Sequence, residues 1–246
     1  FCFLNQSEMC KGMGDAALSH PVGHIVRNDL HFRIGVAHGH ADTGILQHFH
    51  IIFPIAEGNN LIIPLTRYVI AETARRLDAF PRDRHFHIAI NVAARHFANG
   101  LLLRDLHNYW FSVDPVQQLV VELTERDVLQ DGDQHMAEHL HFKGVQLAID
   151  DFGTGYASYA RLKTMNVDIL KIDGSFIRNL LASSLDYQVV DSICRLARMK
   201  NMQVVAEYVE SPEIRQAVIT LGIDYMQGYD IGVPVPLTQL AEEMTG

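Results

Sequence analysis

Two adjacent carboxylates, Asp150 and Asp151, end the apolar run in LAIDDFGTGY. Glu122 and Asn91 stand near the ends of the two preceding apolar runs. Carboxylate and amide oxygens are ligands that hard cations such as Mg²⁺ and Mn²⁺ prefer, and two such ions about 3.5 to 4 Å apart need several anionic ligands with at least one shared. The four side chains therefore predict a two-metal site suited to phosphoryl displacement.

Two further titratable residues, Lys171 and Glu207, end later apolar runs. We expect Lys171 to orient a water molecule or to neutralise charge in a transition state, and Glu207 to act as a base or outer ligand. Any one carboxylate could instead cap a helix or lie in solvent, and Lys171 could pair with Asp173 along its strand. Titratable or amide residues at six successive strand ends favour a functional site.

Histidine pairs separated by one residue offer a different metal site. Residues two apart on a strand share a face, so such pairs could contribute to a zinc centre. A zinc site needs three or four converging ligands, however, and the spacing of these pairs specifies no such convergence. Surface or core histidines are the favoured interpretation. The pairs are His38 and His40, His48 and His50, and His85 and His87.

The elements that must position these residues alternate in kind from about residue 60 onward. Short β-rich apolar runs alternate with amphipathic helical stretches, a pattern typical of a parallel α/β sheet. We expect helices at residues 64–79, 184–199 and 211–221, with Ser184 and Ser211 as caps and Gly222 after the last. We expect strands at residues 86–91, 118–125, 145–150, 167–173, 202–207 and 223–228.

The polar residues cluster at the same end of every predicted strand. In a closed barrel these ends converge on one mouth, whereas in an open doubly wound sheet the two edges lie too far apart to cooperate. The pattern therefore favours a barrel. A length of 246 residues suits a single α/β barrel domain. Residues 1–60 are rich in His and Gly with weak periodicity, and we assign no element there.

Composition narrows the class of protein. A net charge of -9 and a pI near 5.8 argue against DNA binding through a broad basic face. Three scattered cysteines, Cys2, Cys10 and Cys194, predict no disulfide framework and fit a reducing compartment. No apolar run reaches the roughly 20 residues of a membrane helix. We therefore expect a cytoplasmic chain, or the cytoplasmic part of a longer membrane-anchored or sensor-linked protein.

Six motifs in unbroken order, within residues 52–240, resemble the EAL domain, the bacterial phosphodiesterase of cyclic di-GMP. They are NVAAR (91–95), VELTE (121–125), IDDFGTGYASY (149–159), DILKID (168–173), VVAEYVE (204–210) and MQGY (226–229). The resemblance implies a modified TIM-type (β/α)8 barrel and a homodimer. It also implies hydrolysis of cyclic di-GMP to linear pGpG with Mg²⁺ or Mn²⁺. Residues 61–246 would form the well-matched barrel, and residues 1–60 an atypical first strand and loops.

The resemblance also implies a role for each matching position. The implied metal ligands are Asn91, Glu122, Asp150 and Asp151. The implied catalytic residues are Lys171, Glu207 and Glu125, with Glu125 bracing the loop after Asp151. The implied substrate-binding or site-ordering residues are Asp173, Gln227 and Arg95.

Several positions depart from the family pattern. The stretch KGMGDAALSHP (11–21) places Gly14 where the family has the Glu of its Glu-Ala-Leu motif, and no Arg follows. Asp15 could replace that Glu only after a one-residue shift, which would turn its side chain to the other face. Tyr208 replaces a Gly, and Val233 a basic residue. These departures predict a weakened phosphodiesterase or, alternatively, a catalytically degenerate cyclic di-GMP receptor or protein-interaction module.

Overall fold

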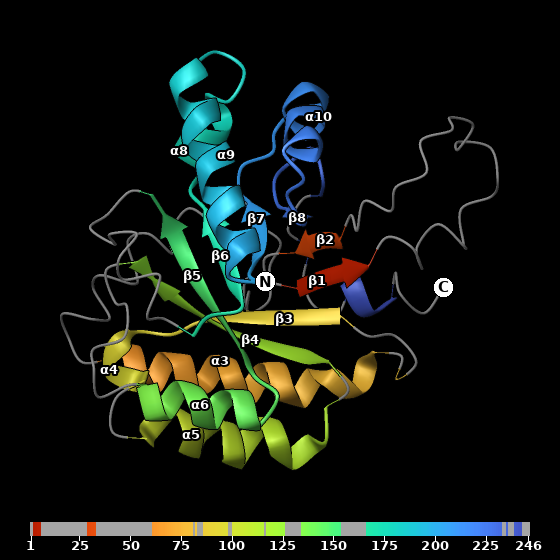
Figure 1. The fold of residues 1–246 in the computed structure, drawn as a ribbon. Helices are drawn as coiled ribbons and strands as arrows, with labels where there is room; N and C mark the ends of the chain where they lie inside the picture. Colours follow the sequence, from red (N-terminus) through yellow and green to blue (C-terminus); the bar gives the residue numbers. More distant parts are fainter. Residues whose placement is uncertain are drawn as a thin grey trace.

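The computed structural model describes residues 2–5, 29–32, 61–80, 82, 86–97, 100–115, 117–125, 134–153, 166–232, 235 and 239–242. Within these ranges the strands close into a barrel (Figure 1). Their order around the barrel is β1 (Cys2–Asn5), β2 (Asp29–Phe32), β8 (Tyr225–Met226), β7 (Gln203–Ala206), β6 (Ile169–Ile172), β5 (Gln146–Phe152), β4 (Gln118–Thr124) and β3 (Phe86–Asn91).

One strand runs against the others. β1 is antiparallel to both of its neighbours, β2 and β3, while every other neighbouring pair is parallel. An ideal (β/α)8 barrel has eight parallel strands. The closed ring with one reversed strand confirms the expectation of a modified TIM-type barrel over an open sheet.

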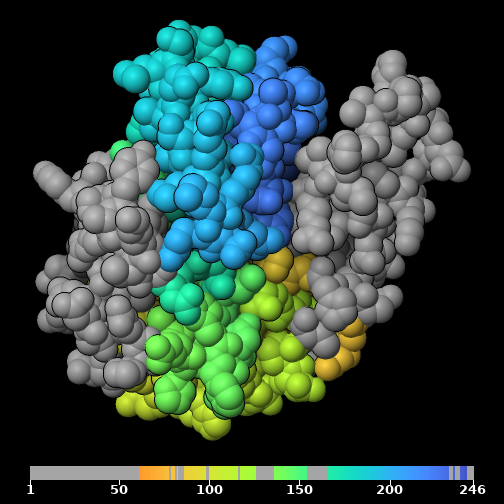
Figure 2. Space-filling view, viewed as in Figure 1, coloured from red at the N-terminus to blue at the C-terminus, as the bar shows by residue number. Residues whose placement is uncertain are grey.

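The helices pack on the outside of this barrel. Helices α3, α5 and α6 cover the side of β3 and β4, whereas α8, α9 and α10 lie beside β6 to β8 (Figure 1). Figure 2 shows the adjoining surfaces of α9 and α10, and Arg198 of α9 donates hydrogen bonds to the carbonyl oxygens of Leu221 and Gly222. The helices are α3 (Ile62–Arg76), α4 (Ala94–Phe97), α5 (Leu101–Asp105), α6 (Gln134–Phe142), α8 (Gly174–Arg178), α9 (Ser184–Met199) and α10 (Pro212–Thr220).

Most predicted elements appear close to their expected bounds. β3 and α9 match the predictions at both ends. The cap of α9 is one residue earlier than expected, because the Ser183 hydroxyl, not that of Ser184, accepts from the amide of Asp186. Ser211 caps α10 as predicted, and Gly222 follows it with a φ of +67°. The two four-residue strands β1 and β2 lie in the stretch to which no element was assigned.

The barrel has an apolar layer inside it. One residue from each of β3 to β8 forms a cluster separate from the larger core between strands and helices: Ala89, Val120, Ala148, Ile169, Val205 and Tyr225. Since residues two apart on a strand share a face, the position two residues later faces the same interior, nearer the carboxyl end. Those positions hold Asn91, Glu122, Asp150, Lys171, Glu207 and Gln227. We call these six residues the mouth ring.

Carboxylates also tie the opposite end of the barrel together. Asp168, which precedes β6, accepts a hydrogen bond from the amide of Leu147 at 2.7 Å. Asp224, which precedes β8, accepts one from the amide of Val204 at 2.8 Å. Each side chain satisfies a backbone donor at the start of the neighbouring strand, so these aspartates stabilise the barrel away from the mouth.

Candidate active site

Lys171 is the hub of the mouth ring. Its Nζ lies 2.6 Å from Asp150 Oδ1, 2.9 Å from Glu207 Oε1 and 3.2 Å from Glu122 Oε1. The lysine is fully buried, and the three carboxylates come from the ends of β4, β5 and β7, around the strand that carries it. The fold thus brings together four of the predicted site residues, which are up to 85 positions apart in sequence (207 minus 122).

Burial and mutual repulsion set the charges of this cluster. Burial raises the pKa of Glu207 to about 7, and the carboxylates of Asp150 and Glu122 add to the rise against the pull of Lys171. Burial also raises the pKa of Glu122. For Lys171 burial acts to lower the pKa, but Asp150, Glu122 and Glu207 outweigh it and raise that pKa well above its usual range. The cluster thus places three carboxyl groups around one ammonium group, and burial opposes the ionisation of Glu122 and Glu207.

A strand irregularity adds Asp151 to this cluster. Consecutive side chains of a regular strand point to opposite faces. Here the β5–β6 pairing shifts register between Ile149 and Phe152, and Asp151 has a φ of +54°. As a result, carboxylate oxygens of Asp150, Asp151 and Glu207 lie within 4.8 Å of one another. Asp151 is exposed while Asp150 is buried, so the pair extends from the barrel interior to its surface.

These residues fit a hard divalent cation. Asp150, Asp151 and Glu207 are the one group of His, Cys, Asp and Glu side chains in the described ranges whose geometry could hold an ion. Within the same ranges, the buried Glu122 Oε2 and Gln227 Oε1 have no hydrogen-bond donor. Oxygen atoms left without donors in a negatively charged interior match the ligand preference of Mg²⁺ or Mn²⁺.

Two other predicted residues, Glu125 and Asp173, accept hydrogen bonds from backbone amides near the cluster. Glu125, buried just after β4, accepts a hydrogen bond from the amide of Gly153 at 2.9 Å. This contact holds the backbone two residues after Asp151. Asp173 caps α8 by accepting from the amide of Ser175 at 2.9 Å. The helix-cap interpretation therefore holds for Asp173.

The remaining predicted residues lie beside the Lys171 cluster, on the surface or outside the described residues. Asn91 pairs in register with Glu122 on the neighbouring strand, which places it in the mouth ring beside a buried carboxylate. Arg95 lies on α4 with an exposed side chain. Gly14, Asp15, Val233 and the paired histidines other than His87 lie outside the described residues. Tyr208 is described and has a φ of +55°.

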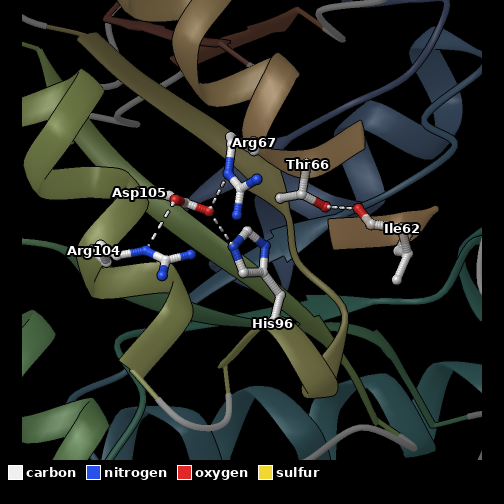
Figure 3. A network of polar contacts seen from close by, with 6 residues as sticks. All are labelled: Ile62, Thr66, Arg67, His96, Arg104 and Asp105. Carbon is white, nitrogen blue, oxygen red and sulfur yellow. Dashed lines mark hydrogen bonds and ion pairs between the residues drawn. The ribbon is translucent and has the colours of Figure 1, made fainter. Parts of the chain in front are cut away.

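A network of polar contacts around the buried Asp105 was not singled out from the sequence (Figure 3). His96 Nε2 lies 2.9 Å from Asp105 Oδ2, to which Arg67 Nε donates at 3.0 Å. The network joins α3, α4 and α5, and α4 begins three residues after Asn91. It therefore ties α4, the first helix after β3, to α3 and α5. Burial lowers the pKa of His96, although the hydrogen bond to Asp105 opposes the shift.

The comparisons with known proteins identify the class of this barrel. The sequence model of the EAL domain matches residues 30–234, and the chain belongs to the EAL domain family. It is 45% identical over 196 residues to the probable cyclic di-GMP phosphodiesterase PdeD of Escherichia coli (strain K12), covering 80% of this chain and 37% of PdeD.

Two further comparisons agree with that assignment. The cyclic di-GMP phosphodiesterase PdeF of the same organism is 63% identical over 129 residues, covering 52% of this chain and 17% of PdeF. The solved structure "PaMucR Phosphodiesterase, c-di-GMP complex" is 35% identical with a TM-score of 0.69, covering 76% of this chain and 84% of that one. The chain thus spans less than half the length of PdeD and PdeF.

One negative observation concerns membranes. Across the residues that the structure describes, none of the helices combines the length and apolar character needed to cross a bilayer.

Proposed function

We propose that this chain hydrolyses cyclic di-GMP to linear pGpG in a reaction that requires Mg²⁺ or Mn²⁺. The observation that carries the proposal is the contact of Lys171 with three carboxylates, which come from the ends of β4, β5 and β7 and lie within 3.2 Å. The relatives PdeD and PdeF are named as cyclic di-GMP phosphodiesterases, and the MucR structure is a complex with that nucleotide. Their names support the choice of substrate.

Four side chains at the barrel mouth would hold the metal ions. Asn91, Glu122, Asp150 and Asp151 would supply oxygen ligands, and two bound divalent ions would neutralise phosphate charge and acidify water. In the hydrolysis, a water oxygen bonds to phosphorus as the bond from phosphorus to the 3′ oxygen breaks, and the proton lost by water balances the one gained by the 3′ oxygen. Lys171 would orient that water, and Glu207 would accept its proton.

The other predicted residues would act around this centre. Glu125 would keep the loop after Asp151 in place through its contact with Gly153. Gln227, with its unpartnered buried oxygen, would order the site from β8. Asp173 would order the site through α8, and the exposed guanidinium of Arg95 would contact the anionic substrate.

The decisive experiment is to incubate the purified chain with cyclic di-GMP and either metal and to measure pGpG by chromatography. We expect product with Mg²⁺ or Mn²⁺, none with a chelator, and a loss of at least about 100-fold for Asp150→Asn. Asp114→Asn, which changes an exposed carboxylate, is the matched control. Tight nucleotide binding without turnover would instead establish the receptor function to which Gly14 and Tyr208 point.

Three broader expectations belong to the same proposal. Residues 1–246 would form one EAL barrel domain, the domain would work as a homodimer, and it would act in the cytoplasm. Light scattering of the purified chain tests the dimer, because a monomer mass at all concentrations would exclude it. Limited proteolysis tests the single domain, and cell fractionation tests the compartment.

A further inference from the structure

Helix α8 contacts the backbone that follows Asp151. It is a five-residue helix directly after β6, the strand that carries Lys171. A Cβ atom placed on Gly153 would lie 2.6 Å from Cε2 of Phe176 in α8, closer than real Cβ contacts allow. Gly153 therefore rests directly on the Phe176 ring, while its amide donates to Glu125. Both contacts hold Gly153, which lies two residues after Asp151.

The same helix contacts the backbone that follows Glu207. A Cβ atom on Gly174 would lie 2.0 Å from Cδ2 of Tyr208 and 2.5 Å from its Cγ. The guanidinium carbon of Arg178 lies 3.9 Å from the centre of the Tyr208 ring, and Arg178 Nε lies 4.0 Å from Glu210 Oε2. The tyrosine ring is thus packed between the first and last residues of α8.

The conformation of Tyr208 depends on those contacts. A positive φ is disfavoured in a bulky residue because its Cβ approaches the backbone, so neighbouring contacts must hold it. Here the φ of Tyr208 is +55°. The amide of the next residue, Val209, donates to the backbone carbonyl oxygen of Gln227. Without its ring contacts the residue would relax, and the chain would move immediately after Glu207.

We propose that α8 positions the carboxylates for metal binding. By holding Gly153 on Phe176 and the Tyr208 ring between Gly174 and Arg178, it sets the distance from Asp150 and Asp151 to Glu207. This inference rests on the proposed metal site, because Asp150 and Asp151 are two of its ligands and Glu207 is the proposed proton acceptor beside them. Phe176 and Tyr208 are positioning residues, and neither has to touch an ion or the nucleotide.

Replacing Tyr208 with two different small residues separates packing from backbone preference. Tyr208→Gly removes the ring and accepts a positive φ without strain, whereas Tyr208→Ala removes the ring but keeps the Cβ atom that disfavours a positive φ. We expect Tyr208→Ala to weaken Mn²⁺ binding at least about tenfold, the scale of lost supporting contacts at metal sites, and Tyr208→Gly to stay within about threefold. Calorimetric titration of the purified chain with Mn²⁺ alone measures both.

A double-mutant cycle tests the contact with Gly174. Gly174→Ala should weaken Mn²⁺ binding about tenfold when Tyr208 is present and have little effect beside Tyr208→Gly, because the methyl group then meets no ring. Phe176→Ala should also weaken binding, whereas Phe142→Ala, which removes a side chain that is 82% exposed, should not. Should Gly174→Ala fail to fold by circular dichroism, the two Tyr208 variants and Phe176→Ala decide the matter.

The outcomes separate this inference from the proposed function. Mn²⁺ binding by the unchanged chain together with undiminished binding by Tyr208→Ala and Phe176→Ala would overturn the role of α8 and leave the metal site standing. A loss in Tyr208→Gly as large as that in Tyr208→Ala would show that the ring contacts themselves, and not only the positive φ, position Glu207, and would support the role of α8. No Mn²⁺ binding by the unchanged chain would overturn both proposals. Turnover by Phe176→Ala that recovers at saturating Mn²⁺ would support positioning over general destabilisation.

Discussion

Lys171 Nζ and Asp150 Oδ1 lie 2.6 Å apart at the carboxyl ends of two neighbouring strands. The ammonium group is fully buried, so its partners in the protein, among them three carboxylates, replace the water it would have outside. Removing one partner of a buried pair leaves an uncompensated charge, which costs far more than losing a surface pair. The contacts of Lys171 with the three carboxylates therefore stabilise the barrel when no metal is bound, and they keep the carboxylates together where cations would bind.

Lys171→Met should lower the free energy of unfolding of the metal-free protein by about 3 to 5 kcal/mol, since three carboxylates lose their counter-charge. Urea unfolding in the presence of a chelator measures the change. Lys143→Met, at an exposed position, should alter stability by less than about 0.5 kcal/mol. Added Mn²⁺ should restore part of the lost stability, and an unchanged urea midpoint for Lys171→Met would contradict this account.

Asp151→Asn should abolish metal-dependent turnover while the protein stays folded, because Asn accepts the same positive φ but carries no charge. Mn²⁺ titration should show at least about a tenfold loss of affinity. Asp114→Asn offers a close control, since Asp114 also has a positive φ, +48°, but its side chain is 99% exposed. Turnover by Asp151→Asn at the normal rate would remove Asp151 from the metal site.

Asp105→Ala should destabilise the protein by about 3 kcal/mol, because buried His96 and half-buried Arg67 both lose their acceptor. Asp191→Ala breaks an ion pair with the exposed Arg195 on α9 and should cost less than about 1 kcal/mol. Mn²⁺ affinity should change little in the folded Asp105→Ala protein. A large loss of affinity would show that the network positions Asn91 as well as stabilising the helices.

Acid should destabilise the protein partly through His87, which lies two residues before Ala89 on β3. Burial lowers the pKa of His87 to about 4. In the unfolded chain, where the pKa of His87 is about 6.5, the imidazole binds a proton at a higher pH than in the folded protein. Its contribution to stability is therefore present above about pH 6.5 and lost as the pH falls toward 4, by at most about 3 kcal/mol.

Urea unfolding of His87→Gln at several pH values tests this assignment. The variant should show a flatter fall in stability between pH 6.5 and 4, whereas His107→Gln, at an exposed position, should follow the unchanged chain. A slope that His87→Gln does not alter would assign the acid sensitivity to other groups, such as buried His96.

The sequence predicts the mouth ring because strand periodicity alone places its members. Glu122, Asp150 and Lys171 each follow an inward-facing apolar residue by two positions, so a correct strand assignment puts all three in one interior. Asp151 breaks that rule. Its carboxylate joins the cluster only through a register shift and a positive φ, and neither feature is visible in residue types.

Other features depend on contacts between distant segments. β1 and β2 are four residues long, and their pairing partners rather than local pattern make them strands. The pair of His96 and Asp105 likewise depends on how α4 packs against α5. In the sequence, each of the two is only a polar residue within a short helical stretch. That pattern does not indicate which residue would be its partner.

The apolar layer formed by Ala89, Val120, Ala148, Ile169, Val205 and Tyr225 gives the mouth ring a closed floor on the side of β3 to β8. Ions therefore do not approach the ring through this layer. Asp151 is exposed whereas Glu122, Asp150 and Glu207 are buried, so Asp151 is the carboxylate of the cluster that an arriving ion can meet first. A nucleotide resting over Asp151 would cover it, so we expect the cations to load before the substrate.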